Sequence, residues 1–530
     1  MDDLTLLTVF ALGSCAVILL AQRLTTIQKA KRLPLPPGPK TTWLGGSQLP
    51  QTYHWLTYAR WKDTFGDIIY IYAFGNPIIV LNTAEAANQL LDKRGDIYSS
   101  RPLRTMVGEL MGWDWLFSGM PYGPWWRRHR TIFQKYFHIN MSSDYHPGQI
   151  LETHTMLRNL LVSPNNFNHH IRRTAAAIVL KIAYGHIVAD EGDSYVALAE
   201  AAMRTSAHAG FFGTYLVDYI PILKYVPSWM PGASFKRKAR EWRRLSREML
   251  ESQFEIVKQK MAKGTAVSCV ATKELENWID SDGDADQEEL IKNISAIIYG
   301  GASAFITDAG SLLTFKFIAG ADTTVSAIGS FFLAMVLYPD VQRKARDELD
   351  RVLGDNRLPS FADKSSLPYI SCIVWECLRW NPVAPMGLAH YVTEDDEYNG
   401  YRIPKGSTVL PNIWAILHDE HTYPNPLEFH PERFEDQEKN RLAGVNEYPS
   451  AFGFGRRICP GRWLAYDSIW IVVASVLSVY KITAATDYKG TLILPSPEYT
   501  PGLISHPKPF KCRIFPRSEA AAALIRQTEA

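Results

Sequence analysis

The chain has 530 residues, of which 46% are hydrophobic and 12% aromatic, so it can bury a large core in one big domain or in two or three smaller ones. Its net charge of +2 excludes a general electrostatic affinity for nucleic acid. The six cysteines are widely spaced and form no Cys-x-x-Cys pair, which argues against a zinc site or a disulfide framework and favours a reducing compartment around most of the chain.

The first segment is an apolar run at residues 4–21 that carries no charge. At about 1.5 Å per residue, a helix of this length spans roughly 27 Å, just enough for the core of a bilayer. Basic residues follow the run from Arg23 onward, whereas Asp2 and Asp3 precede it, so the C-terminal side is expected in the cytosol. A cleaved signal peptide is the alternative, but its basic residues should come before the apolar run. We therefore predict a single-pass membrane anchor at residues 1–22.

A basic and proline-rich hinge is predicted at residues 23–39, because the prolines between 34 and 39 favour a stiff, extended backbone. Residues 40–516 are then expected to form the main domain. Residues 517–530 are expected to be a short tail that frays.

Inside the main domain, polarity patterns predict both helices and short strands. Alternation around Gly75 and Asn76 predicts a β-hairpin at residues 68–81. Short β-like runs broken by two turns predict a small antiparallel patch at residues 391–414. Helical spacing marks residues 103–116, 121–137, 172–209 and 462–477.

Cys459 lies in a glycine-rich loop, residues 451–461, that ends where a predicted helix begins. The glycines let the backbone approach a flat group, and the partial positive charge at a helix start favours a thiolate over a thiol. With the ring of Phe452 and the cation of Arg457 close in sequence, this thiolate suits an axial ligand of haem iron, to which sulfur supplies electron density. A buried structural cysteine is the alternative. The pattern Phe-x-x-Gly-x-Arg-x-Cys-x-Gly is expected by chance in well under about one chain per thousand, which favours the haem ligand.

The loop Ala-Phe-Gly-Phe-Gly-Arg-Arg-Ile-Cys-Pro-Gly resembles the haem-binding loop of the cytochrome P-450 family of monooxygenases, and the phrase Trp-Asn-Pro-Val-Ala-Pro looks like fungal members. The resemblance implies a mainly α fold with a small β region (α+β) and haem b held by the Cys459 thiolate. It implies hydroxylation of a hydrophobic small molecule with O₂. Electrons would come from NADPH through the FAD and FMN of a cytochrome reductase, docking near the positive charge of Arg127, Arg128 and Arg456. The anchor would place the protein in the endoplasmic reticulum membrane with its catalytic domain in the cytosol.

A second motif, Ala-Gly-Ala-Asp-Thr-Thr, lies in a long apolar helical segment. Gly320 allows a ligand to press against the helix, and Asp322 and Thr323 place a carboxylate and a hydroxyl near that gap. Oxygen activation needs two protons, which such a pair can relay through water. Alone, the hexapeptide fits a polar notch in a helix equally well. It resembles the oxygen-activation motif of the family, which makes Asp322 and Thr323 the predicted catalytic residues.

Glu376 and Arg379 lie three residues apart on one helical face, surrounded by apolar residues. A surface ion pair is the common case, but here we expect burial and further partners. With Arg433 in Pro-Glu-Arg-Phe, the arrangement resembles the Glu–Arg–Arg triad of the family, a structural element.

The resemblance also assigns partners to the two haem propionates. Trp126 and Arg130, spaced Trp-x-x-x-Arg, share one helical face and can donate N–H bonds to a carboxylate. A buried tryptophan beside a surface arginine is the alternative. His390 and Arg457 match two further propionate contacts, and Arg101 is a weaker candidate.

Substrate contacts are placed by resemblance alone, in segments whose apolar or small residues suit a hydrophobic substrate. Ordinary core packing is the alternative. The fungal resemblance suggests a secondary metabolite or xenobiotic of polyketide, terpenoid or steroid, aromatic or indole type. The candidate segments are residues 106–116, 211–216, 382–389 and 502–505.

Residues 301–318 depart from the pattern of the family, in which the preceding helix reaches the Ala-Gly-x-Asp-Thr-Thr motif much sooner. We interpret them as a retained intron, which sequencing the transcript would test, and a genuine insertion is the alternative. Two other functions stay open: a haem-thiolate isomerase or peroxygenase, and an inactive membrane protein if the insertion is real. Asn140 and Asn293 match glycosylation acceptors, but a cytosolic domain would leave both unmodified.

Overall fold

The computed structural model describes residues 33–41, 46–47, 49–50, 52–73, 75–209, 215–280, 285–300, 319–354, 356–436 and 450–529. Three predicted features lie outside the described residues: the membrane anchor, the basic part of the hinge at residues 23–32, and the insertion at residues 301–318.

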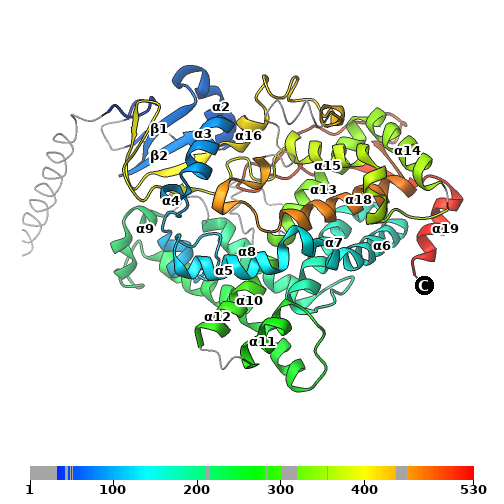
Figure 1. The fold of residues 1–530 in the computed structure, drawn as a ribbon, viewed down its shortest axis with the longest axis horizontal. Coiled ribbons are helices and arrows are strands. Elements are labelled where there is room, and N and C mark those ends of the chain that lie inside the picture. Colours follow the sequence, from blue (N-terminus) through cyan, green and yellow to red (C-terminus); the bar gives the residue numbers. More distant parts are fainter. Residues whose placement is uncertain are drawn as a thin grey trace, which may run out of the picture.

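Helices make up most of the described chain, and the strands gather mainly at one side of the molecule, around β1 and β2 at the upper left of Figure 1. The predicted fold class, mainly α with a small β region, is confirmed for the described residues. The helices are α2 (His54–Phe65), α3 (Ala84–Ala87), α4 (Gly95–Tyr98), α5 (Pro124–Phe137), α6 (His146–Val162), α7 (Phe167–Tyr184), α8 (Ser194–Ala209), α9 (Leu216–Tyr219), α10 (Ser234–Ala262), α11 (Val270–Asp280), α12 (Ala285–Gly300), α13 (Ala319–Leu337), α14 (Pro339–Leu353), α15 (Pro368–Trp380), α16 (Ile413–Leu417), α18 (Arg462–Val479) and α19 (Glu519–Gln527).

The strands form three small sheets. The largest has the order β1-β2-β6-β3, with β1 and β2 antiparallel and β2 and β6 parallel. The hairpin predicted at residues 68–81 is confirmed, with Gly75 at φ 88° in its turn. The predicted patch at 391–414 is also confirmed, although its strands divide between this sheet and the β4–β5 hairpin. The strands are β1 (Ile68–Ala73), β2 (Asn76–Leu81), β3 (His390–Tyr391), β4 (Asp396–Tyr398), β5 (Tyr401–Ile403), β6 (Thr408–Pro411), β7 (Tyr480–Thr486), β8 (Leu492–Ile493) and β9 (Cys512–Pro516).

Helix α18, which follows the cysteine loop, lies in the middle of the helical body. It is apolar on all sides and almost every residue from Leu464 to Val479 is buried, as expected for a helix enclosed by other helices. It packs against α6, α13, α14 and α15. Among the described residues it is the one unbroken helix long and apolar enough to cross a bilayer, but 78% of this stretch is buried inside the protein.

Both ends of the main domain are held more firmly than the sequence predicts. In the described part of the hinge, the carbonyl of Pro34 accepts a hydrogen bond from Arg402 and that of Pro37 accepts one from Tyr70, each at 2.8 Å. The tail expected to fray instead forms α19, because Ser518 caps its N-terminus and Ile525 is fully buried.

Candidate functional site

The cysteine loop is closed by a hydrogen bond of 2.9 Å from the Cys459 N–H to the carbonyl of Phe452. Two glycines are required for this path. Gly453 has a φ of 79°, in the left-handed region that favours glycine, and its missing side chain leaves open space. A Cβ on Gly455 would lie 2.5 Å from the carbonyl oxygen of Leu91, so the loop could not approach the short helix η2 (Asn88–Lys93) this closely with any other residue.

A cavity of about 290 Å³ lies over this loop. Cys459 faces the cavity, and the walls come from α5, α7, α12, α13, α18 and the segment that follows α15. The cavity brings together all of the predicted haem-contacting residues, namely Trp126, Arg130, His390, Phe452, Arg457 and Cys459.

The two arginines predicted to bind the propionates also donate hydrogen bonds to backbone carbonyls. Arg457 donates to the carbonyls of Ser99 and Met120 at 2.6 and 2.7 Å, and its guanidinium lies 4.3 Å from the centre of the Trp126 ring. Arg130 donates to the carbonyl of Ile458 at 2.7 Å, next to Cys459 in sequence. These bonds fix where the guanidinium groups stand in the cavity wall.

Arg101 and His390 complete the polar part of the wall. Arg101 donates to the carbonyls of Ser118 and Ala389 at 3.0 and 2.8 Å. His390 lies 2.8 Å from the carbonyl of Tyr98 through its Nδ1. The weaker candidate Arg101 therefore lines the same cavity as the four stronger ones.

This cavity carries unbalanced positive charge. Burial, followed by repulsion from Arg101 and Arg130, lowers the pKa of Arg457 to about 8. Burial likewise lowers the pKa of Arg101 to about 9. The described lining includes no Asp or Glu, and the indole N–H of Trp126 is buried without a hydrogen-bond partner among the described residues. A ligand with carboxylates would neutralise the charge and accept that N–H bond, so the residues present fit a haem with its propionates.

The position of Cys459 corrects one part of the sequence argument. Burial raises the pKa of the Cys459 thiol, while the Gly461 N–H, Arg130 and Arg462 lower it by less. In the chain without haem, burial therefore opposes the thiolate that the sequence predicts. The first residue of α18 is Arg462, so the cysteine precedes the helix by three residues and feels its end only weakly. A bound metal ion would deprotonate the thiol by coordination.

The two residues of the predicted acid–alcohol pair point in different directions. Thr323 and Thr324 line the cavity, but Asp322 does not. The Asp322 carboxylate is buried and lies 3.3 Å from Nη1 of Arg172 and 3.0 Å from Nε2 of His506. The structure therefore brings Thr323, but not Asp322, to the cavity wall, and the catalytic roles predicted for these two residues stay predictions.

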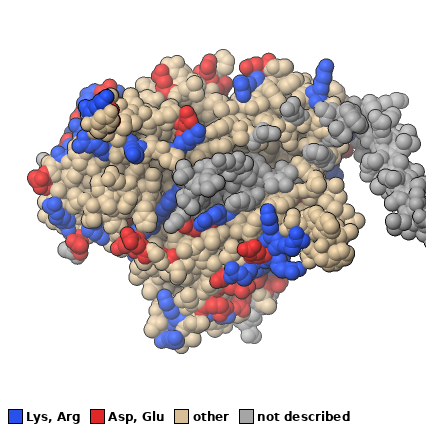
Figure 2. Space-filling model, turned by 180° about the vertical axis from the view of Figure 1, so that it is seen from behind, with Lys and Arg blue, Asp and Glu red and all other residues tan. Residues whose placement is uncertain are grey.

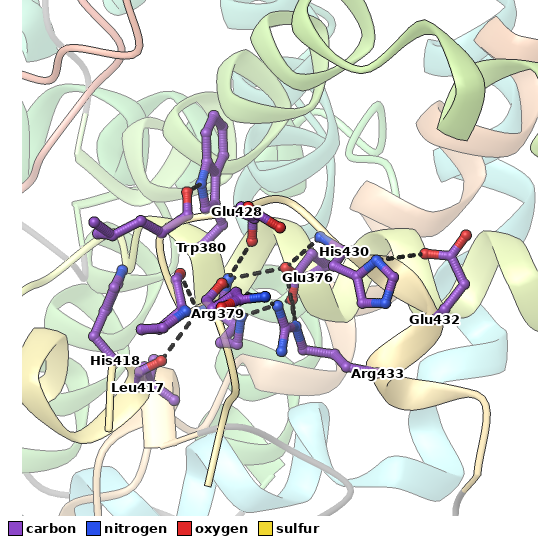
Figure 3. A network of polar contacts seen from close by, with 12 residues as sticks. Glu376, Arg379, Trp380, Leu417, His418, Glu428, His430, Glu432 and Arg433 are labelled. Atoms are coloured by element: carbon purple, nitrogen blue, oxygen red, sulfur yellow. Dashed lines mark hydrogen bonds and ion pairs between the residues drawn. The ribbon is translucent and has the colours of Figure 1, made fainter. Parts of the chain in front are cut away.

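Glu376, Arg379 and Arg433 form a buried ion-pair network between α15 and the short helix η8 (Pro431–Phe434), which Figure 3 shows from close by. Arg379 donates Nε and Nη2 to the two carboxylate oxygens of Glu376 at 2.7 and 2.9 Å, and both side chains are fully buried. Arg433 donates its Nε to Glu376 at 3.2 Å. The remaining donors of Arg379 reach carbonyls of the 417–428 segment, so this network ties that segment to α15.

The predicted substrate segments contribute unequally to the cavity. Val383, Ala384, Gly387 and Leu388 line it, as does Ile504. No residue of 106–116 lines it, residues 210–214 lie outside the described residues, and Tyr215 and Leu216 do not reach it.

Several wall residues were missed from the sequence. Phe117 lies one residue beyond a predicted segment, and Ile297 and Ile298 lie near the end of α12. Ile178 comes from α7. Their apolar character is shared with the whole core, so no local signal separates them from it.

Comparisons with known proteins identify the family to which the chain belongs. The sequence profile of the family described as cytochrome P-450 matches residues 36–514. Cytochrome P-450 monooxygenase 98 of Postia placenta is 44% identical over 511 residues, which cover 95% of this chain and 94% of that protein. A cytochrome P-450 monooxygenase of Armillaria gallica is 41% identical over 502 residues, 94% of each chain. Monooxygenase 208 of Postia placenta is 39% identical over 520 residues, 97% of each chain.

The chain therefore belongs to the cytochrome P-450 family, and it is an oxidoreductase of the monooxygenase class. Membership implies haem held by a cysteine thiolate, O₂ and a small-molecule substrate.

Proposed function

We propose that this protein is a membrane-anchored monooxygenase that hydroxylates a hydrophobic small molecule of fungal secondary metabolism, or a xenobiotic, with electrons from an NADPH–cytochrome reductase. The observation that carries the proposal is the cavity over Cys459. Among the described residues, it places one thiol, a buried indole N–H without a hydrogen-bond partner and three guanidinium groups around one apolar space.

In this proposal Cys459 would hold the haem iron, and Trp126, Arg130, His390 and Arg457 would bind the two propionates. Phe452 packs beside the cysteine. When bound, haem supplies the iron at which O₂ is activated for insertion of one oxygen atom into a C–H bond. The Thr323 hydroxyl holds a proton at the cavity wall, and the apolar walls exclude bulk water.

The composition of the walls supports an apolar substrate. Phe117, Ile297, Val383, Leu388 and Ile504 all present hydrocarbon surface to the cavity. Such a surface binds a hydrophobic skeleton by burying its area and offers few hydrogen bonds for orientation. Polyketide, terpenoid or steroid, aromatic and indole compounds all meet this requirement.

A positive surface beside the cysteine loop supports docking of an acidic reductase. Arg456, three residues before Cys459, is exposed, as is Arg127 on α5. Both guanidinium groups lie over the ring of Tyr122, at 5.4 and 5.6 Å from its centre, so the two elements bring their cations together, although Arg456 also pairs with Asp96 at 2.6 Å. Arg128 follows Arg127 on the same helix. Complementary charge mainly speeds encounter between partners.

Exposed apolar side chains support a membrane contact in addition to the predicted anchor. Figure 2 shows a lobe of mostly uncharged surface beside a group of Lys and Arg side chains, at the right-hand side, where α9 lies in the opposite view of Figure 1. On such a surface, the apolar side chains can insert into a membrane while the cations contact anionic lipid headgroups. In this proposal the membrane is that of the endoplasmic reticulum, and the domain lies in the cytosol. The exposed apolar residues are Leu216, Ile220, Ile222, Tyr225, Trp229 and Met230, and the cations at the start of α10 include Arg237, Lys238 and Arg240.

A labelled-oxygen assay tests this function. The purified protein, a cytochrome reductase and NADPH are supplied with isotopically labelled O₂ and a panel of aromatic, steroid and terpenoid compounds. We expect one labelled oxygen atom in a product, and no product when NADPH, reductase or the Cys459 thiol (Cys459→Ser) is missing. Product formed with hydrogen peroxide alone would instead indicate a peroxygenase, and an unlabelled rearranged product would indicate an isomerase.

A further inference from the structure

One face of α13 holds the C-terminal loop at residues 499–507. Asp322, Ser326 and Ser330 follow each other at intervals of four residues, so they lie on the same helical face, and all three are buried. Each of them contacts the loop. Ser326 donates to the carbonyl of Ser505 at 2.5 Å, the hydroxyl of Tyr499 donates to Ser330 at 3.1 Å, and Nε2 of His506 lies 3.0 Å from Oδ2 of Asp322.

The contact with His506 differs from the other two because its partner is a carboxylate. The Asp322 side chain is only 4% exposed, so a carboxylate at this position needs buried partners, and among the described residues these are Arg172 and His506. Arg172 holds Oδ1 and is 20% exposed, while His506 holds Oδ2 and is 8% exposed. Both carboxylate oxygens are thus engaged, and the deeper partner is the histidine.

The loop that carries His506 also forms part of the cavity wall. Ile504, two residues earlier, lines the cavity, and the Ser505 N–H donates to the carbonyl of Val383, another wall residue, at 2.8 Å. The neighbour of Asp322 on α13, Thr323, lines the cavity as well. His506 therefore connects the predicted acid with the wall against which a substrate would lie.

We propose that His506 is a positioning residue for proton delivery. Its Nε2 fixes the orientation of the Asp322 carboxylate, and from this orientation protons reach Thr323 at the cavity wall. This inference rests on the proton-delivery role predicted for Asp322. The contact from the C-terminal loop, rather than the more exposed Arg172, sets the orientation, because it is the shorter and more deeply buried of the two.

Proton delivery can be measured without knowing the substrate. In the presence of reductase and NADPH alone, reduction of O₂ by two electrons and two protons gives hydrogen peroxide, and reduction by four electrons and four protons gives two waters. Impaired delivery through Asp322 favours the peroxide. The amounts of NADPH consumed and peroxide formed give the ratio of the two products.

Two histidine replacements differ only in reach. The amide nitrogen of Gln approximates the position of His Nε2, whereas that of Asn approximates Nδ1 and falls short of Asp322. We expect the water-to-peroxide ratio of the holoenzyme to stay near the wild-type value in His506→Gln. We expect it to fall about tenfold in His506→Asn, as for loss of one hydrogen bond to a charged group, and by at least as much in Asp322→Asn.

A matched control distinguishes the positioning of Asp322 by His506 from a purely structural role in which His506 anchors the C-terminal loop to α13. Tyr499→Phe removes another contact between the same loop and α13 without touching Asp322, so it should keep the wild-type ratio. A second readout does not depend on turnover: in urea denaturation of the holoenzyme, the midpoint of the His506→Asn/Asp322→Asn double variant should lie no lower than that of Asp322→Asn alone.

The outcomes distinguish the two claims. A wild-type ratio in His506→Asn together with a lowered ratio in Asp322→Asn would overturn the inference and leave the role of Asp322 standing. An unchanged ratio in Asp322→Asn would overturn both. A ratio in Tyr499→Phe as low as that in His506→Asn, or additive shifts in the denaturation midpoint, would show that His506 only holds the loop, which also overturns the inference.

Discussion

Trp126 shows how one side chain prepares the site for a ligand. Its ring packs against Phe117 and Tyr122 and carries the guanidinium of Arg457, so its orientation is determined by neighbours on three sides. Its indole N–H is nevertheless buried without a partner among the described residues. Leaving such a donor unpaired costs about 1–3 kcal/mol, a cost that a haem carboxylate would remove.

Trp126→Phe should weaken haem retention and leave the rest of the molecule intact. Phe keeps the ring packing and removes only the N–H, so the lost bond to a carboxylate should speed haem loss by about 10-fold or more. Transfer of haem to an acceptor apoprotein measures the rate. Trp113→Phe is the matched control, because the Trp113 N–H is also buried without a partner in the described part of the chain, but Trp113 does not line the cavity. Equal rates in the two variants would contradict the assignment.

His129, on the same helix, links stability to pH. It is fully buried, and burial lowers its pKa to about 4, although its bond to the carbonyl of Trp125 opposes this. Unfolded histidine titrates near pH 6.5, so between these values the unfolded chain binds a proton that the folded chain does not, and stability falls as pH falls.

His129 alone should therefore reduce the free energy of unfolding by about 2 kcal/mol between about pH 7 and pH 5. Urea denaturation of wild type and His129→Gln at both pH values measures this, and the variant should lose correspondingly less. Replacement of the exposed His421 by Gln should leave the pH dependence as in wild type. If His129→Gln behaves like His421→Gln, the buried neutral histidine is not the cause.

At the scale of single elements, α13 shows that a sequence motif does not specify the direction in which its side chains point. The sequence locates the acid and the alcohol in one helix, and the structure places them there. Thr323 and Thr324 both line the cavity whereas Asp322 does not, and the motif alone does not show which of its side chains turns away. Which of them faces the cavity depends on α7 and the C-terminal loop, through Arg172 and His506, and both are distant in the sequence.

The network at α15 is an element whose partners the motif spacing predicts well. Glu376 and Arg379 are paired because three residues bring them to one face, and Arg433 adds a second guanidinium. The further carbonyl partners of Arg379 come from a loop with no recognisable pattern, so they could not be predicted.

Glu376→Gln should destabilise the protein by roughly 3–5 kcal/mol, because it leaves two buried guanidinium groups without a counter-charge. Asp340→Asn is the control: this carboxylate is 82% exposed and pairs with Arg343 on the surface, so its loss should cost under about 1 kcal/mol. Denaturation midpoints of the two holoenzyme variants provide the comparison. Equal shifts would mean that the buried network contributes no more than a surface pair.

At the scale of the whole molecule, local patterns predict the elements and tertiary packing decides the cavity. The hairpin and the helix after the cysteine loop follow from periodicity and glycine positions, whereas the mainly α class is implied by the family resemblance. Residues 106–116 were expected at the substrate, but Met106 and Met111 are fully buried in the core, since an apolar segment looks the same in both settings. The retained-intron interpretation of residues 301–318 stays a prediction that transcript sequencing tests.

The whole account depends on Cys459 as the ligand of haem iron. Its most direct test is the difference spectrum of the reduced protein with carbon monoxide, recorded for wild type, Cys459→Ser and, as control, the buried Cys512→Ser. We predict that the absorption band typical of a thiolate-ligated haem is present in wild type and in Cys512→Ser and absent in Cys459→Ser. A Cys459→Ser protein that retains this band would contradict the assignment of the ligand and the function built on it.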